Sequence, residues 1–168
     1  HLLSRRQRQM CIRDSNIIIP DLRGHGKSQG TYIGMGWHER LDIVDLTNYI
    51  ANTYKESQII LFGVSMGAAT VMSASGEKLP GNVKVIIEDC GYTSTWNQFS
   101  YQLKALFKIP AFPLMHVASI ICKLRAGYFI SESSPIKQLK KSTTPTLFIH
   151  GDKDGFVPFF MPVSYTHL

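Results

Sequence analysis

The chain has 168 residues, 44% of them hydrophobic, and a formal net charge of +6. This length allows one domain with one core, and charged residues and prolines interrupt every apolar stretch before it could span a membrane. Its three cysteines are too few for a disulfide framework and lack the spacing of metal ligands, so we expect no metal and no cofactor.

Both ends of the chain are expected to be foreign to the domain. Residues 1–15 show neither apolar periodicity nor helix caps, and most of them resemble the translation of a transposase adapter used in DNA library preparation. Residues 162–168 end in a sequence that resembles the same adapter read on the opposite strand. We therefore expect a natural segment at 16–161, cut from a longer protein. The alternative for the first tail is a basic arm that binds nucleic acid.

Setting the tails aside weakens the charge argument for a nucleic-acid partner. Residues 1–15 hold four arginines and one aspartate, a net charge of +3, which leaves +3 on the rest of the chain. The remaining basic residues are scattered, so we expect no nucleic-acid partner. A cytoplasmic location is the expectation for this part of the protein, and a signal or anchor outside it would change that. The sequence leaves the oligomeric state open.

The domain is expected to begin with a short buried strand at 16–20, whose three isoleucines leave no polar face. The loop at 21–28 then reads Asp-Leu-Arg-Gly-His-Gly-Lys-Ser. It is not a P-loop, because Asp21 stands where a phosphate-binding loop needs glycine. We interpret His25 as orienting this loop, and a catalytic role is the alternative.

Next come a predicted helix at 37–54 and a predicted strand at 58–62. The helix is indicated by apolar residues three and four positions apart, and His38 near its start is expected at the surface. The strand runs into a Gly-x-Ser-x-Gly pattern at 63–67, and small residues predict a second helix at 66–75.

The Gly-x-Ser-x-Gly pattern between a strand and a helix predicts a nucleophile elbow rather than an ordinary glycine-rich turn. Such a turn holds Ser65 in a strained conformation and lifts its hydroxyl above the sheet. We expect Gly63 and Gly67 to be glycine because side chains there would collide with the turn. The helix start directs backbone N–H groups, including that of Met66, at whatever Ser65 attacks.

A long apolar segment separates the next strand, predicted at 83–87, from the last one, predicted at 144–149. Up to about residue 130 its apolar residues have helical spacing and are too many for one face of a surface helix. We expect a lid at about 94–140 whose inner face lines an apolar pocket, with ordinary core packing as the alternative. A short helix is predicted at 131–141.

Three motifs resemble those of bacterial α/β-hydrolases of the prolyl-oligopeptidase-like, serine-aminopeptidase-like group. They are Asp-x-Arg-Gly-x-Gly-x-Ser at 21–28, Gly-x-Ser-x-Gly at 63–67 and His-Gly-x-x-Asp-x-x-Val-Pro at 150–158. The resemblance covers 16–161. It implies part of an α/β-hydrolase fold, with a mostly parallel sheet flanked by helices and a helical, lid-like insertion after the strand at 83–87.

The resemblance also implies roles for single residues. Ser65 is the expected nucleophile, the backbone N–H of Met66 one oxyanion donor, and Asp154 the acid of the triad. A carboxylate after a later parallel strand suits that role, and Asp89, after the preceding strand, is the alternative acid. Asp152 is expected to cap the loop and His150 to be structural.

The implied reaction is acyl transfer to water from a small ester or related carbonyl substrate, which is the expected partner. A peptidase of the same fold and a non-catalytic hydrolase-like binding module are the alternatives, whereas a dehalogenase would need an acid in place of Ser65. The triad histidine is expected after Asp154, and the second oxyanion donor is expected before residue 16. The chain itself should therefore be nearly inert.

The resemblance finally predicts a gap in the sheet. In the family another strand lies between those expected at 16–20 and 58–62. These two strands should then either stand apart or close up and pair directly.

Overall fold

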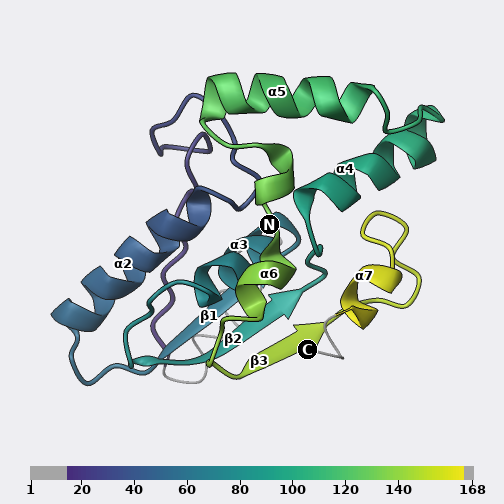
Figure 1. Ribbon diagram of the computed structural model, residues 1–168. Helices are drawn as coiled ribbons and strands as arrows, with labels where there is room; N and C mark the ends of the chain where they lie inside the picture. Colours follow the sequence, from purple (N-terminus) through teal and green to yellow (C-terminus); the bar gives the residue numbers. More distant parts are fainter. Residues whose placement is uncertain (1–14, 165–168) are drawn as a thin grey trace.

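A computed structural model describes residues 15–164, so most of both expected tails lies outside the described residues (Figure 1). Within this range β1 (Ile59–Val64), β2 (Val83–Asp89) and β3 (Thr146–Ile149) form a parallel sheet in the order β1-β2-β3. The predicted parallel sheet flanked by helices is confirmed. β3 begins two residues later than expected, after Pro145, which has no backbone N–H to donate.

The register of the sheet brings the carboxyl ends of all three strands to one edge. Val64 pairs with Asp89, and Asp89 pairs with Ile149. The pairing continues one step past the strands, since the Ser65 N–H donates to the Asp89 carbonyl (2.8 Å) and the Cys90 N–H to the Ile149 carbonyl (2.8 Å). The three loops that follow the strands therefore start side by side.

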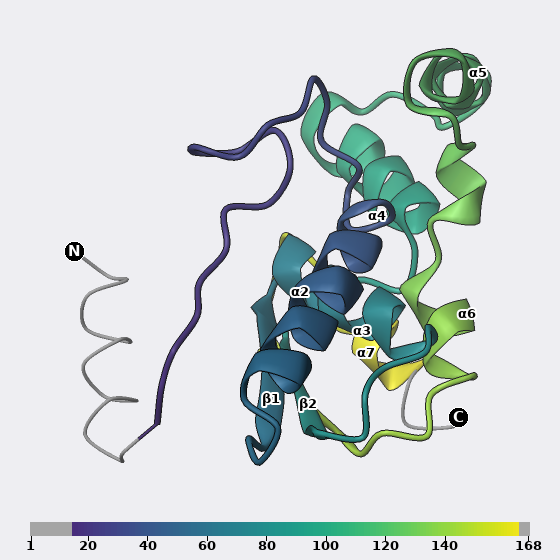
Figure 2. The same ribbon diagram turned by 90° about the vertical axis from the view of Figure 1, so that its left-hand side faces the viewer.

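Helices cover one face of this sheet and extend beyond its carboxyl edge (Figures 1 and 2). The segment expected to be a lid contains α4, a π-helical turn, α5 and a 3₁₀ turn, and Pro135 begins the next helix. The helical elements are α2 (Glu39–Thr53), α3 (Met66–Ser75), α4 (Thr95–Gln102), the π-helical turn Leu103–Phe107, α5 (Leu114–Ala126), the 3₁₀ turn Ile130–Glu132, α6 (Pro135–Leu139) and α7 (Phe160–Val163). The prediction for α3 is confirmed to the residue, whereas α2 begins two residues later than expected. None of the described helices is long and apolar enough to cross a membrane.

The two faces of the sheet are buried unequally. On the face under α2 and α3, Ile86 is fully buried and packs with Ile59 and Leu61. On the opposite face Ile60 and Leu147 are 59% and 52% exposed. The alternation of buried and exposed positions along β1 follows from the period of two of a β-strand.

The expected strand at 16–20 is wrong. The structure gives 15–20 no strand, and Ile18 and Ile19 are 54% and 56% exposed. In Figure 2 this segment runs beside β1 at a distance, and β1 ends the order of the described sheet. A strand exists only when its N–H and C=O groups find a neighbouring strand, and three apolar side chains cannot supply one.

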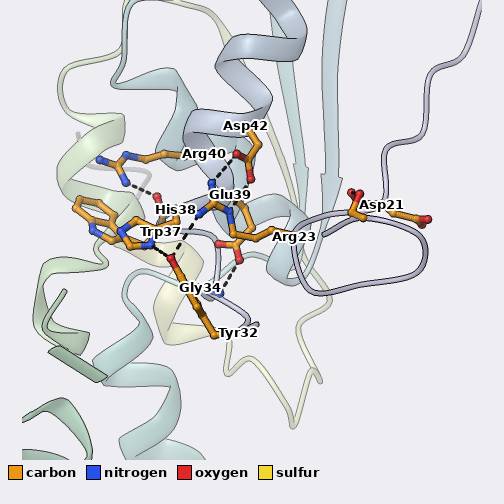
Figure 3. A network of polar contacts seen from close by, with 10 residues as sticks. Asp21, Arg23, Tyr32, Gly34, Trp37, His38, Glu39, Arg40 and Asp42 are labelled. Carbon is orange, nitrogen blue, oxygen red and sulfur yellow. Dashed lines mark hydrogen bonds and ion pairs between the residues drawn. The ribbon is translucent and has the colours of Figure 1, made fainter. Parts of the chain in front are cut away.

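Polar contacts tie the loop after this segment to α2 (Figure 3). The Arg23 guanidinium donates two hydrogen bonds to the Asp42 carboxylate, at 2.5 and 2.7 Å. The Tyr32 hydroxyl lies 2.6 Å from His38 Nδ1. His38 is therefore packed against the loop and partly exposed, and burial lowers its pKa. His25 Nδ1 lies 3.1 Å from the Arg23 carbonyl, which agrees with a role in orienting the loop.

A second connection joins the same loop to the chain after α5. The Glu39 side chain is fully buried, and it accepts a hydrogen bond from the Gly34 N–H (2.5 Å). The Tyr128 hydroxyl donates to the Gly34 carbonyl (2.8 Å). Both backbone groups of one glycine are thus satisfied by buried side chains, and the one from Tyr128 comes from a distant part of the chain.

Another buried carboxyl group, that of Glu88 on β2, lies beneath α3. Its Oε2 accepts a hydrogen bond from the Gly91 N–H (2.8 Å), while Oε1 is buried without a hydrogen-bond partner among the described residues. Burial raises the pKa of Glu88 from 4.5 to about 7. The folded protein therefore keeps the proton of Glu88 over a pH range in which the unfolded chain has lost it.

This raised pKa predicts a pH-dependent stability that Glu88→Gln should remove. As the pH rises from 4.5 to 7, the free energy of unfolding should fall by up to about 1.4 kcal/mol per pH unit, because only the unfolded state releases the proton. Urea unfolding from pH 4.5 to 8 measures it. The difference between Glu88→Gln and the unchanged chain isolates Glu88 from other titrating groups such as His38. Parallel pH profiles for the two proteins would contradict this account.

Candidate active site

Ser65 occupies the turn that joins β1 to α3. Its backbone lies at φ 54° and ψ −114°, a region that residues other than glycine rarely adopt. Two hydrogen bonds hold the turn: the Ser65 N–H donates to the Asp89 carbonyl, and the Ser65 carbonyl accepts from the Ala69 N–H (3.0 Å). The strained strand-to-helix turn expected from the sequence is present.

The two glycines of this turn have different roles. A Cβ atom on Gly63 would lie 2.2 Å from the carbonyl oxygen of Gly67, so no side chain fits there. A Cβ atom on Gly67 would meet nothing within 4 Å. The expected collision at Gly63 is confirmed and that at Gly67 is wrong, because β1 approaches the backbone of α3 while Gly67 faces open space.

The first N–H groups of α3 come directly after Ser65. The first four N–H groups of an α-helix have no partner inside the helix and carry a partial positive charge. Met66 is the first residue of this ten-residue helix. Its N–H is thus adjacent to the serine hydroxyl, as an oxyanion donor would need to be.

Asp154 lies in the loop between β3 and α7 and holds that loop in shape. Its Oδ1 accepts hydrogen bonds from the N–H groups of Phe156 (2.8 Å) and Val157 (2.9 Å). The loop-capping bonds thus go to Asp154, and Asp152, which we expected to cap the loop, is exposed instead. Asp154 receives these bonds because the turn brings the N–H groups of the residues two and three positions after it back to its side chain.

His150 supports the same loop, in agreement with the expected structural role. Its Nε2 lies 2.8 Å from the Val157 carbonyl and therefore carries the hydrogen that it donates. The same Nε2 is 3.7 Å from Asp154 Oδ2, and the imidazole is almost fully buried. His150 thus stabilises the loop through its hydrogen bond to the Val157 carbonyl.

Residues of α4 also hold the Asp154 loop, and no motif in the sequence indicated this contact. The side-chain amides of Gln98 and Gln102 both donate to the Phe156 carbonyl, at 2.8 and 2.5 Å, and Gln98 is 3% exposed. The Tyr101 hydroxyl reaches the Gly155 carbonyl at 3.4 Å. The helix after β2 and the loop after β3 are therefore one packed unit.

The Cys90 thiol is influenced by Ser65 and by acidic side chains. Burial raises the pKa of its thiol, the Ser65 backbone N–H lowers it, and the charges of Asp89 and Asp154 raise it again. Both candidate acids are therefore close enough to influence one thiol beside Ser65. The sequence analysis did not identify Cys90 as a neighbour of the site. Its position directly after β2 and before Gly91 could have indicated this.

The groups gathered at this edge suit acyl transfer better than metal chemistry. They comprise a strained serine, helix N–H groups and two carboxylates, and no histidine of the described residues is bonded to Ser65. In residues 15–164 no three His, Cys, Asp or Glu side chains are grouped so that they could hold a metal ion.

Solved structures with this architecture are α/β-hydrolases. A structure described as an alpha-beta serine hydrolase homologue from Coxiella burnetii is 20% identical, covers 87% of this chain and 50% of its own, and has a TM-score of 0.54. The esterase Pf2001 of Pyrococcus furiosus is 21% identical over 87% of this chain and 53% of its own, with a TM-score of 0.63. The fold is thus that of the α/β-hydrolases.

Sequence comparison identifies a narrower family within this fold. A family model described as serine aminopeptidase, S33, matches residues 6–119, and the chain belongs to this family. The uncharacterized protein YqkD of Bacillus subtilis is 33% identical over 144 residues, which are 85% of this chain and 47% of that protein. The chain spans about half the length of the curated relatives it matches. The matched range begins within the expected first tail, so the boundary at residue 15 stays a prediction.

The two elbow glycines give a paired test of the turn. Gly63→Ala should lower the free energy of unfolding by about 1–3 kcal/mol or more, because the new methyl group would overlap backbone that cannot move aside. Gly67→Ala, the matched control, should leave it unchanged or raise it by up to about 1 kcal/mol, since alanine is the better helix former. Urea unfolding of both variants measures these changes in the free energy of unfolding. Equal effects would contradict the close approach of β1 and α3.

Proposed function

We propose that this chain carries the nucleophile, one oxyanion donor and the acid of a serine hydrolase. Ser65 is the nucleophile, the Met66 N–H is the donor and Asp154 is the acid. The observation that carries the proposal is the strained backbone of Ser65 at the carboxyl edge of a parallel sheet, where the loop of Asp154 also begins. Strain of this kind costs stability and persists at sites where it serves a function.

The proposed reaction proceeds in two steps. Ser65 Oγ attacks the carbonyl carbon of an ester or related substrate, a histidine takes the hydroxyl proton, and the leaving group departs with that proton. Water then attacks the acyl-serine and gives a proton to the histidine, which passes it to Ser65 Oγ as the acid product is released. The Met66 N–H stabilises the negative oxygen formed in each step, and Asp154 orients the histidine and balances its charge.

The histidine and the second oxyanion donor belong, in this proposal, to parts of a longer protein. Loss of one oxyanion donor costs roughly 10² to 10³ in kcat, and loss of the base can cost on the order of 10⁶. The small-molecule acyl substrate is thus turned over by the longer protein and hardly at all by these 168 residues.

The family description favours one second candidate, a peptidase of the same fold. An ester and an amide present the same carbonyl to Ser65, and they differ in the leaving group that the histidine must protonate. A panel of p-nitrophenyl esters and aminoacyl amides, tested on the longer protein, separates the two. A protein that turned over neither would be the third alternative, a hydrolase-like binding module.

The first prediction of this proposal concerns the 168-residue chain alone. It should hydrolyse p-nitrophenyl acetate no faster than its Ser65→Ala variant, because the base is absent. The initial rates of the two proteins at equal concentration measure this. Hydrolysis that depends on Ser65 would show that the chain already contains a working base.

The second prediction distinguishes the two candidate acids in the longer protein. Asp154→Asn should lower kcat by about 10⁴, because an amide in place of the acid holds the imidazole in the wrong tautomer. Asp89→Asn, the matched control, should change kcat far less. The reverse order would assign the acid to Asp89, and losses below tenfold in both variants would refute a carboxylate of this chain as the acid.

A further inference from the structure

Helix α5 is apolar on two opposite sides. Its inner side is packed, with Met115 and Ser119 only 2% and 6% exposed. Its outer side carries large apolar side chains, and four of the five exposed ones, 44–81% exposed, have spacings of three and four that place them on one face. We call these four the α5 stripe: Leu114, Val117, Ile121 and Leu124. A helix that only covers a protein core needs one apolar face, so the stripe requires another partner.

The stripe lies at the outer limit of the molecule. In Figure 1, α5 is the element farthest from the sheet, and Figure 2 shows it end-on at a corner of the ribbon. Phe112, just before the helix, is 71% exposed, and Leu106 and Phe107 in the π-helical turn are 64% and 65% exposed. Large apolar groups gathered on one side of a protein mark an interaction surface.

The chain segment that carries the stripe has charged residues of one sign only. Between Asp89 and Glu132 the sequence contains no acidic residue, and its cations are Lys104, Lys108, Lys123 and Arg125, all exposed. The nearest acid along the chain, Glu132, lies 3.6 Å from Lys123. An apolar stripe on a segment whose own charges are all cationic complements a surface with an apolar interior and an anionic boundary.

We propose that the α5 stripe binds the surface of an anionic lipid bilayer. The stripe enters the boundary between head groups and acyl chains, and the cations contact the lipid phosphates, as in helices that lie in the plane of a membrane. This contact is peripheral, since none of the described helices could cross a bilayer. A second copy of the chain fits less well, because pairing two stripes would bring two wholly cationic segments together. The proposal is independent of the chemistry at Ser65.

Vesicle co-sedimentation tests the proposal on the 168-residue chain. The chain should bind vesicles of phosphatidylcholine and phosphatidylglycerol, bind pure phosphatidylcholine more weakly, and lose affinity as salt is added. Leu124→Glu should weaken binding to the mixed vesicles about tenfold or more, because a large buried side chain is replaced by a charge. Leu124 is 81% exposed, so the variant should fold as the unchanged chain does, which circular dichroism checks.

Two control variants carry the same new charge elsewhere. Tyr49→Glu alters an equally accessible position on α2, and Ile60→Glu alters the exposed face of the sheet. Both should bind the mixed vesicles as the unchanged chain does. Arg125→Glu should reduce the preference for phosphatidylglycerol and leave the weak binding to pure phosphatidylcholine in place.

Four results would overturn the proposal. One is no binding to the mixed vesicles, and another is undiminished binding by Leu124→Glu. A third is that Ile60→Glu abolishes the binding, which would assign it to the sheet. The fourth is a dimer in size-exclusion chromatography that Leu124→Glu dissociates while vesicle binding is absent, which would identify a second copy as the partner.

Discussion

The contact between the end of β1 and the start of α3 decides the geometry of everything around it. The chain must reverse direction within one residue there, and the position of Gly63 against the carbonyl of Gly67 leaves no room for a side chain. The reversal forces Ser65 into a positive φ. This conformation costs stability, and hydrogen bonds to β2 and α3 hold it in place.

Carboxyl groups, two of them fully buried, fix the loops around this turn. Glu39 holds Gly34 before α2, Glu88 holds Gly91 after β2, and Asp154 holds the loop after β3. Each accepts a hydrogen bond from the backbone, because a loop packed against a core must satisfy its N–H groups somewhere. Burial makes such groups costly when they ionise, and the raised pKa of Glu88 is the sign of that cost.

Apolar side chains are buried on one side of the sheet and exposed elsewhere on the molecule. Ile86 and its neighbours under α2 and α3 form a closed core, whereas Ile60 and Leu147 on the other face of the sheet are exposed. Parallel sheets are ordinarily covered on both faces. The α5 stripe differs from that exposed sheet face, because only the stripe is bordered by an all-cationic segment, and the two surfaces therefore call for partners of different chemistry.

The sequence by itself determined the bounds of α3 and the strained turn at Ser65, because these follow from local patterns: a run of small residues, and glycines around one serine. It predicted the parallel sheet through the resemblance of three motifs to a known family. It failed at 16–20, where apolar residues predict a strand that has no hydrogen-bonding neighbour, and at Gly67, whose surroundings are open. Only the tertiary structure decided that Gln98 and Gln102 donate hydrogen bonds to the loop of Asp154, and that Cys90 lies near Ser65. These contacts join residues more than 20 positions apart, and no local pattern encodes which distant backbone group a side chain will meet.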